Sequence, residues 1–215
     1  MNALQLPAFY PVLDTEILSY RGLNPTEAAE AILEGGACIL QFRHKGFFSR
    51  DVFEIATRVA ALCDQAKARF VMNDRADIAR LLAADLHLGQ DDLEPADARR
   101  IAPLGAIIGL STHDERQLRA GDREAVDYLA IGPIFPTGSK QNPDPVVGVE
   151  ALRTLRTITQ KPLVAIGGIT REKAPVVFEA GADSVAIIGD LYPAPLTKPI
   201  LRSRVEAWLA ILSSR

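Results

Sequence analysis

Apolar stretches recur along the chain at a steady interval, and segments of helical period separate them. The apolar stretches are rich in β-branched and aliphatic residues, as strands are, and they read FYPVL, CILQF, FVMN, LHLG, AIIGL, YLAIG, PLVAIGG and SVAIIG. The segments between them repeat apolar residues at three-four spacing, which is typical of a helix with one buried face. The pattern therefore predicts eight strands that alternate with helices.

The predicted helices carry local signals for where they begin and end. In the stretch 24–37, Asn24 is a suitable N-cap, Pro25 stands in the first turn, and glycines follow the last periodic residue. The stretch 49–67 carries the longest apolar stripe. Further helices are predicted at residues 76–84, 96–102, 115–121, 149–157, 173–180 and 200–212.

Strand–helix alternation indicates a parallel sheet. Eight such units in 215 residues fit an α/β fold of the closed (β/α)8 type, a TIM barrel, in a single domain that spans residues 1–215. The alternative is a doubly wound open sheet, which usually has fewer strands and a glycine-rich phosphate-binding turn after the first strand. The residues around the end of the first predicted strand, LDTEILSYRG, contain no such turn. We therefore expect the barrel.

Composition and charge narrow the class of protein. Hydrophobic residues make up 48% of the chain, charged residues 24%, and the net charge is −3. These values are ordinary for a soluble globular protein and argue against a dedicated nucleic-acid-binding surface. No apolar run approaches the roughly 20 residues that span a bilayer, and the first residues show no secretory signal. We expect a cytoplasmic protein without a membrane partner, in which Cys38 and Cys63 are small buried residues. The sequence leaves the oligomeric state open.

Polar residues collect after the predicted strands. In a barrel, reactive groups lie at the carboxyl ends of the strands. From the second strand onward, these ends read QFRHK, NDR, GQDD, STHD, GPIFPTGSK, GGIT and GD. The beginnings of the strands carry mainly small and apolar residues. This asymmetry predicts one site at the carboxyl-terminal mouth of the barrel.

The end of the second strand is the most informative of these segments. Gln41, Arg43 and Lys45 share one face of the strand because side chains alternate along it. We expect this face to point into the mouth of the barrel, and we expect His44, on the other face, to have a packing role. Two cations at one mouth require anionic partners, which could be nearby carboxylates, a phosphorylated ligand or both.

Two carboxylates follow neighbouring strands and could lie close together. Asp74 follows the third strand and Asp92 follows the fourth. Magnesium is typically held by one or two carboxylates, completed by water and substrate phosphates. The three histidines of the chain lack a zinc-type spacing. With the cations of the second strand and Lys140, this pair of carboxylates favours a magnesium-diphosphate site over a zinc site.

Two further segments could bind phosphate. PTGSK offers the hydroxyls of Thr137 and Ser139 beside Lys140, in a long loop predicted at residues 135–146. The order GSK differs from that of a Walker loop. AIGGIT presents backbone N–H groups after the seventh strand, where barrels commonly bind phosphate.

Read in order, these motifs resemble the thiamine phosphate synthase family. The family succession Q-x-R-x-K, N-D-x-x-D, H-x-G-Q-x-D, S-x-H, G-P-x-x-x-T-x-T/S-K and G-G-I appears here as QFRHK, NDRAD, HLGQDD, STH, GPIFPTGSK and GGI. The resemblance runs from about the second strand to the eighth. It implies a TIM barrel and a Mg2+-dependent transfer, in which hydroxymethylpyrimidine diphosphate loses diphosphate and a hydroxyethylthiazole phosphate takes up the pyrimidinylmethyl group, giving thiamine phosphate.

The resemblance also implies a role for each matching residue. It assigns diphosphate binding to Arg43, Lys45, Asn73 and Lys140, Mg2+ to Asp74 and Asp92, the pyrimidine to Gln41 and Ser111, and the thiazole phosphate to Thr137, Ser139, Gly168 and the N–H of Gly189. The reaction of the family passes through a pyrimidine cation. That intermediate suits a site rich in groups that hold the leaving diphosphate.

The chain departs from the family pattern in two places. The family usually has ADGVH before LGQ, whereas this chain has ADLH at residues 84–87, one residue shorter. We expect a tighter helix exit there, with Gln90 and Asp92 in their usual places. The eighth strand ends in Ile188 and Gly189 where the family often has Val-Ser, so one hydroxyl is lost.

Two other functions are compatible with parts of this pattern. A thiazole tautomerase of the same superfamily would isomerise the thiazole phosphate with a histidine, for which His113 is the candidate. A non-catalytic barrel that binds a phosphorylated ligand would keep the phosphate-binding groups without needing two carboxylates for Mg2+. Because both the cations and the carboxylates are present, the synthase is the favoured prediction.

Overall fold

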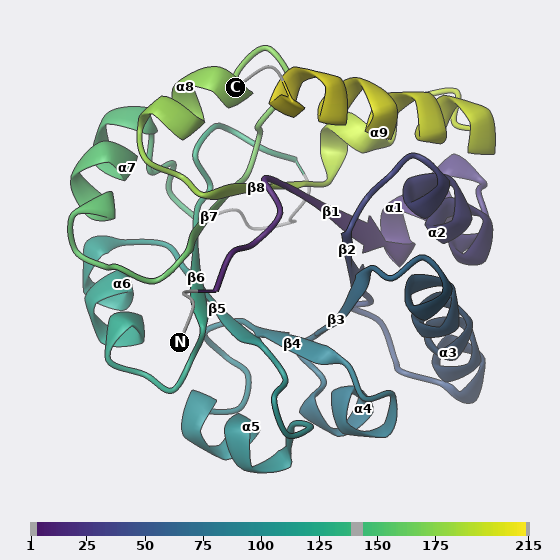
Figure 1. The fold of residues 1–215 in the computed structure, drawn as a ribbon, viewed down its shortest axis with the longest axis horizontal. Coiled ribbons are helices and arrows are strands. Elements are labelled where there is room, and N and C mark those ends of the chain that lie inside the picture. Colours follow the sequence, from purple (N-terminus) through teal and green to yellow (C-terminus); the bar gives the residue numbers. More distant parts are fainter. Residues whose placement is uncertain (1–3, 139–143, 214–215) are drawn as a thin grey trace.

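Eight parallel strands close into a barrel, and helices lie around its outside (Figure 1). The computed structural model describes residues 4–138 and 144–213. The strands are β1 (Phe9–Asp14), β2 (Ile39–Arg43), β3 (Arg69–Asn73), β4 (Asp85–Leu88), β5 (Ile108–Thr112), β6 (Tyr128–Ile131), β7 (Leu163–Ile166) and β8 (Ser184–Ile187). Each strand pairs with its neighbours in sequence, and β8 pairs with β1. The predicted (β/α)8 barrel is confirmed.

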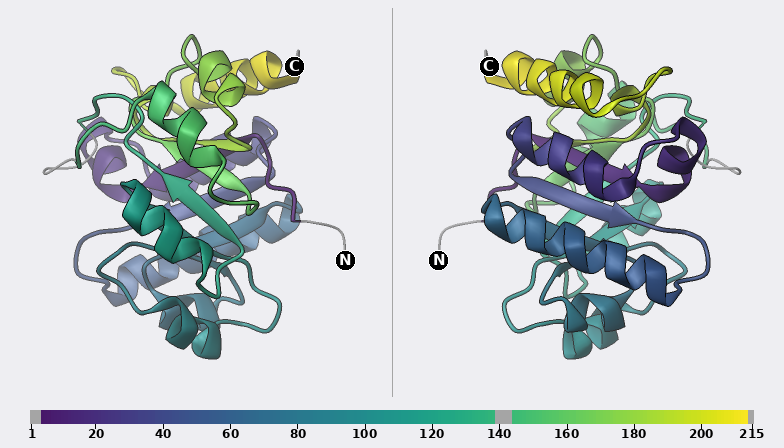
Figure 2. Two further views of the ribbon diagram at one scale, coloured as in Figure 1. Left: turned by 90° about the vertical axis from the view of Figure 1, so that its left-hand side faces the viewer. Right: turned by 90° about the vertical axis from the view of Figure 1, so that its right-hand side faces the viewer.

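Helices follow the strands and pack on their outer faces, as the side views show (Figure 2). They are α1 (Thr15–Arg21), α2 (Pro25–Glu34), α3 (Arg50–Gln65), α4 (Ala76–Leu81), α5 (Pro95–Ile101), α6 (Glu115–Asp122), α7 (Val149–Arg156), α8 (Ala174–Glu179), the short 3-10 helix η1 (Gly189–Leu191) and α9 (Lys198–Ser213). Asn24 caps α2, accepting a hydrogen bond from the N–H of Thr26 at 2.8 Å. Helix α1 was not predicted, because no loop separates it from the first strand: Asp14 ends β1 and also caps α1.

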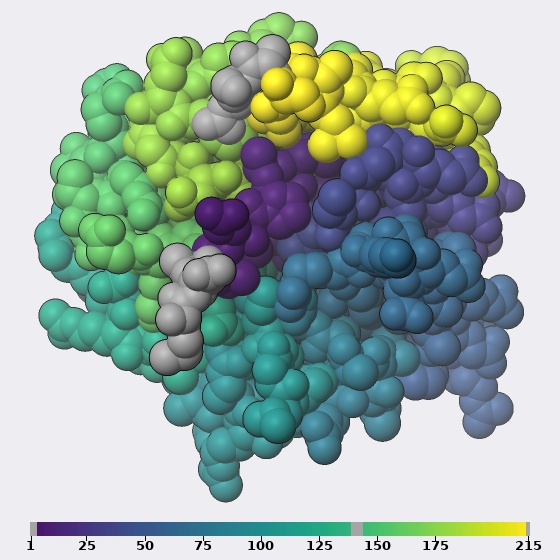
Figure 3. Space-filling view, in the orientation of Figure 1, coloured from purple at the N-terminus to yellow at the C-terminus, as the bar shows by residue number. Residues whose placement is uncertain are grey.

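The core has two parts, as side-chain alternation along the strands requires. Outward-facing residues such as Leu40 and Phe42 pack against the helices in one large cluster. Inward-facing residues fill the barrel itself and form a smaller cluster of Tyr10, Val12, Ile39, Val71, Tyr128, Ala130, Val164 and Ala186. The N-terminal segment lies across one end of the barrel (Figure 3), where Leu6 packs against this inner cluster. The opposite end, at the carboxyl ends of the strands, remains available for a site.

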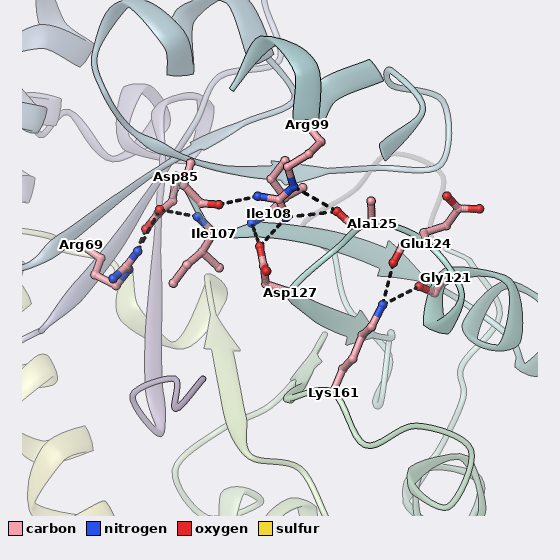
Figure 4. A network of polar contacts seen from close by, with 11 residues as sticks. Arg69, Asp85, Arg99, Ile107, Ile108, Gly121, Glu124, Ala125, Asp127 and Lys161 are labelled. Carbon is pink, nitrogen blue, oxygen red and sulfur yellow. Dashed lines mark hydrogen bonds and ion pairs between the residues drawn. The ribbon is translucent and has the colours of Figure 1, made fainter. Parts of the chain in front are cut away.

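At the amino ends of the strands, aspartates join neighbouring strands (Figure 4). Asp85 accepts hydrogen bonds from the Arg69 guanidinium at 2.7 and 2.9 Å and from the N–H of Ile107 at 2.8 Å. Asp127 likewise accepts hydrogen bonds from the Arg99 guanidinium at 2.6 Å and from the N–H of Ile108 at 2.7 Å. These contacts satisfy strand N–H groups far from the mouth, so we assign them to stability.

The prediction for the cysteines is half right. Cys63 is buried on α3, where desolvation raises the pKa of its thiol to about 12. Cys38 is exposed, which the apolar pattern around it did not indicate. It stands just before the first residue of β2, at the amino end of the barrel. None of the described helices is long and apolar enough to cross a membrane.

Candidate active site

The carboxyl-terminal mouth of the barrel holds a cavity of about 1320 Å3. Ten of the residues predicted for the site line it: Gln41, Arg43, Lys45, Asn73, Asp74, Asp92, Ser111, Thr137, Gly168 and Gly189. The other two, Ser139 and Lys140, lie outside the described residues. The structure thus brings together side chains from strands that are far apart in the sequence, as the barrel prediction required.

Arg43 is held in place by a residue that the sequence analysis missed. Asp14 ends β1 and stands opposite Arg43 in the strand register, and the two side chains form an ion pair. The same carboxylate accepts the N–H groups of Glu16 at 3.1 Å and Ile17 at 3.0 Å, so it also caps α1. An acidic residue between a strand and an unrecognised short helix was the available signal. Asp14 therefore fixes the guanidinium before any ligand arrives.

Asp74, Lys45 and Asp92 form one charged group on the wall made by β2, β3 and β4. The ammonium of Lys45 lies 2.5 Å from the carboxylate of Asp74, and Asp92 is a hydrogen-bonding neighbour of Asp74. Desolvation raises the pKa of Asp74 above its ordinary value, the adjacent Asp92 adds to the rise, and Lys45 opposes it. The backbone of Asp74 has a left-handed φ of +65°, held by a hydrogen bond from its N–H to the carbonyl of His87 at 2.8 Å.

This donor set fits a magnesium ion that is completed by other ligands. Within residues 4–138 and 144–213, no three or more His, Cys, Asp and Glu side chains are grouped so that they could hold a metal ion. Asp74 and Asp92 thus supply two carboxylates and no more. Magnesium is commonly bound in this way, with waters and phosphate oxygens filling the remaining positions. A cation would also relieve the repulsion that raises the pKa of Asp74.

Asn73, next to this group, has an unused donor. The residue is 7% exposed, and its Nδ2 has no hydrogen-bond partner in the described part of the chain. A buried donor without an acceptor costs about 1–3 kcal/mol, so such atoms usually mark a place where another group binds. Here the position beside Lys45 and Asp74 suits an anionic oxygen of a ligand.

The polar run after β4 is explained by its contacts. Gln90 donates to the carbonyl of Ser111 at 2.7 Å and so joins the β4 loop to β5. Asp92 turns back and accepts the N–H of Gly89 at 2.6 Å, whereas Asp91 is exposed on the cavity rim. The contact with Gly89 holds the Asp92 side chain, and the choice of Asp92 over Asp91 as a metal ligand stays a prediction. The one-residue deletion before His87 has not displaced Gln90 or Asp92 from the cavity.

The opposite wall contains a glycine turn whose backbone lines the cavity. Gly167 and Gly168 follow β7 with φ of +98° and +62°, and a Cβ on Gly168 would lie closer than 3.0 Å to the carbonyl of Pro136. Phe135 donates its N–H to the carbonyl of Gly167 at 3.0 Å, which joins the β6 loop to this turn. Only glycine permits this approach, and the turn leaves room for a ligand to reach backbone N–H groups.

Two side chains near this turn have contacts that the sequence did not indicate. Lys173 places its ammonium 3.5 Å from the carbonyl of Gly168 and 4.5 Å from the ring centroid of Phe135, and it lines the cavity. His113 contacts the carbonyl of Gly132 through Nδ1 at 2.6 Å.

His44 contacts Thr15 at 2.8 Å and packs edge-on against Phe48, so the packing role predicted for it is confirmed.

Comparison with known proteins gives one consistent family. A sequence model described as thiamine monophosphate synthase matches residues 9–191. A thiamine-phosphate synthase from Koribacter versatilis is 43% identical, and the alignment covers 99% of each chain. A thiamine-phosphate synthase from Methanospirillum hungatei is 40% identical over 86% of this chain and 89% of its own.

Solved structures agree with the fold. A thiamine phosphate pyrophosphorylase from Pyrococcus furiosus superposes with a TM-score of 0.83 at 29% identity, over 96% of this chain and 95% of the other. A 2-keto-3-deoxy-6-phospho-gluconate aldolase from Zymomonas mobilis superposes with a TM-score of 0.68 at 16% identity, over 96% and 94% of the two chains. The second likeness shows a shared barrel and nothing about chemistry.

Proposed function

The chain belongs to the thiamine monophosphate synthase family, and we propose that it forms thiamine phosphate from hydroxymethylpyrimidine diphosphate and hydroxyethylthiazole phosphate. In this reaction the C–O bond to diphosphate breaks, and the thiazole nitrogen forms a new C–N bond to the same methylene carbon. Diphosphate leaves with the bonding electron pair. The enzyme is then a transferase that acts on small molecules, with no part for nucleic acid or membrane.

One observation carries this proposal: the cavity has two walls suited to phosphate, and they face each other. The wall from β2 to β4 supplies Arg43, Lys45 and Asn73 beside two carboxylates, and the wall at β7 supplies the Gly167–Gly168 turn. In a closed eight-stranded barrel, β3 and β7 lie opposite each other. Two substrates held by their phosphate groups on opposite walls would bring their reactive ends together in the middle.

The charged wall suits the diphosphate, which must leave with growing negative charge. Arg43 is already oriented by Asp14, and the unpaired donor of Asn73 is available to an oxygen. Mg2+ held by Asp74 and Asp92 would supply positive charge to the leaving group. Lys45 would donate to the diphosphate in place of Asp74. Lys140, on the loop after β6, would add a further cation on closure and exclude water from the pyrimidine cation.

The glycine wall suits the smaller phosphate of the thiazole substrate. The N–H groups of Gly168 and Gly189 and the hydroxyl of Thr137 would donate to it, with Ser139 contributing from the same loop. Gly189 opens η1 and offers a backbone donor where the family often has a serine hydroxyl. The ammonium of Lys173 lies beside the turn and would offset the charge of the phosphate.

The decisive experiment incubates the protein with both substrates and Mg2+ and follows thiamine phosphate and diphosphate. Both products are expected, in equal amounts. Isomerisation of the thiazole phosphate without coupling would instead indicate a tautomerase, and binding without turnover would indicate a non-catalytic barrel. Asp92→Asn is expected to abolish the Mg2+-dependent turnover, with Asp91→Asn as the matched control that loses only a small part of it. Equal losses in the two variants would contradict the metal assignment.

A further inference from the structure

A chain of hydrogen bonds crosses the barrel interior beneath the cavity. Gln41 Nε2 lies 3.1 Å from the hydroxyl of Tyr10, the hydroxyls of Tyr10 and Tyr128 are 2.8 Å apart, Tyr128 lies 2.9 Å from Nδ1 of His87, and Nε2 of His87 lies 2.9 Å from Oγ of Ser111. The five side chains come from five different strands. The two ends, Gln41 and Ser111, are the residues proposed to contact the pyrimidine.

The middle of this chain is closed to water. Tyr10 and Tyr128 are each 1% exposed, and His87 is 8% exposed. Desolvation raises the pKa of both phenols far above the ordinary value, so both hydroxyls keep their protons. Each hydroxyl has one proton to donate. Because a buried proton without an acceptor is costly, the direction of one hydrogen bond favours one direction for the next.

The contacts define one direction for the whole chain. Gln41 donates its amide N–H to Tyr10. The direction that gives each buried phenol proton an acceptor within the chain then has Tyr10 donating to Tyr128 and Tyr128 donating to Nδ1 of His87. A neutral imidazole that accepts at Nδ1 carries its proton on Nε2. Nε2–H then donates to Ser111. The Gln41 carbonyl oxygen is left to accept from a ligand, and the Ser111 hydroxyl is left to donate to one.

Packing fixes the central ring of this chain. The ring of Tyr128 stacks on His87 with centroids 5.6 Å apart and planes at 23°. Gly109 stands opposite Tyr128 in the strand register, and a Cβ there would lie closer than 3.0 Å to three atoms of the tyrosine ring. The absence of a Cβ at Gly109 thus leaves the space that the ring fills, and from this position the hydroxyl reaches both of its partners.

We propose that Tyr10, Tyr128 and His87 are positioning residues that fix the pocket as an acceptor at Gln41 and a donor at Ser111, and so select an aminopyrimidine over an oxopyrimidine. The inference rests on the proposed function, because it takes the pyrimidine of thiamine as the ligand. An amino group donates to the Gln41 oxygen, and a ring nitrogen accepts from the Ser111 hydroxyl. An oxo group in place of the amino group presents an acceptor to an acceptor, which costs binding.

The first test needs no substrate. The chain contains three histidines, so the ring 15N shifts of His87 can be assigned by NMR with a His87→Gln variant as reference. The protonated nitrogen is expected to be Nε2, and Tyr128→Phe is expected to shift the ring toward a mixture of tautomers. A proton on Nδ1 in the wild-type protein, or a tautomer unchanged in Tyr128→Phe, would overturn the inference.

The second test measures substrate choice. We compare kcat/KM for the aminopyrimidine diphosphate with that for its deaminated oxo analogue. Tyr128→Phe is expected to reduce the preference for the amino substrate by about tenfold, raising KM for the pyrimidine and leaving KM for the thiazole phosphate unchanged. Tyr10→Phe interrupts only the Gln41 end and is expected to give a smaller reduction.

Tyr192→Phe is the matched control. Its hydroxyl donates to the carbonyl of Val12 at 2.8 Å in an equally buried place, outside the chain. The control is expected to lose stability and to keep the substrate preference. A preference that Tyr128→Phe leaves unchanged, or that Tyr192→Phe reduces equally, would contradict a positioning role. If the wild-type protein shows no turnover, the proposed function fails, and dissociation constants for the two diphosphates then decide the same question. If neither diphosphate binds, both the proposed function and the positioning role are overturned.

Discussion

Gly109 lies under the ring of Tyr128, and replacing it by alanine tests how closely the barrel interior is packed around the hydrogen-bond chain. The added methyl group would come closer than 3.0 Å to the Cζ and both Cε atoms of the ring. The ring has no room to retreat, because it stacks on His87 and its hydroxyl contacts Tyr10 on one side and His87 on the other. Gly109→Ala must therefore displace the ring.

The expected cost has two sources. Overpacking a filled core costs about 1–3 kcal/mol. Displacement of the ring also breaks two hydrogen bonds of the Tyr128 hydroxyl, each worth about 0.5–1.5 kcal/mol. Together these give a loss of about 2–6 kcal/mol in the free energy of unfolding. That is a large part of the roughly 5–15 kcal/mol typical of a folded protein.

Urea unfolding of Gly109→Ala and wild type, followed by circular dichroism, measures this loss. Gly138→Ala is the control for stability, because a Cβ there meets no atom of the described residues within 4 Å. A double-mutant cycle with Tyr128→Leu, which removes most of the ring, should show that alanine at 109 costs less in that background. An unfolding free energy of Gly109→Ala within about 0.5 kcal/mol of wild type would refute the packing argument.

The remaining predictions concern the charged residues. Arg43→Ala and Lys45→Ala should raise KM for the diphosphate substrate more than KM for the thiazole phosphate, and equal increases would indicate a general structural role. Lys173→Met should raise KM for the thiazole phosphate roughly tenfold, about 1.4 kcal/mol, and leave inhibition by the dephosphorylated thiazole unchanged. Because the pKa of Asp74 is raised in the folded protein, Mg2+ affinity measured by titration should begin to fall at a higher pH than for an ordinary aspartate. In the metal-free protein, the same raised pKa makes the free energy of unfolding fall as the pH rises from the pKa of Asp74 in the unfolded chain through its pKa in the folded protein. Asp74→Asn should remove this pH dependence, which thermal unfolding measures.

The fold was predictable because it depends on periodicity, which the sequence displays directly. Eight apolar stretches gave eight strands, and alternation placed Gln41, Arg43 and Lys45 on the face that lines the cavity. Helix α1 was missed because it follows β1 without a loop, and with it the double role of Asp14 was missed. Local pattern thus identified most elements and their faces, and failed where a strand passes directly into a helix.

The hydrogen-bond chain could not be predicted, for a different reason. Tyr10, Tyr128 and His87 each stand in an apolar strand, and each by itself is an ordinary inward-facing core residue. Their contacts depend on the relative height of β1, β4 and β6 in the closed barrel, which is set by the register of every strand pair between them. Counting along one strand shows which face of the strand a residue occupies. The sequence does not show the register between strands, which determines which residues lie beside each other.

The ion pairs at the mouth connect metal binding to substrate binding in the proposed reaction. Lys45 and Asp74 form an ion pair, so neither is fully available to another partner. A diphosphate that draws Lys45 away leaves Asp74 beside Asp92 with no counter-ion, which favours a divalent cation there. The cation would in turn favour the diphosphate, since magnesium held by two carboxylates has further positions that phosphate oxygens can fill. Arg43 does not take part in this exchange, because its partner Asp14 is also the cap of α1 and stays in place. The mouth therefore contains one cation that keeps its partner, Arg43, and one that would change its partner, Lys45.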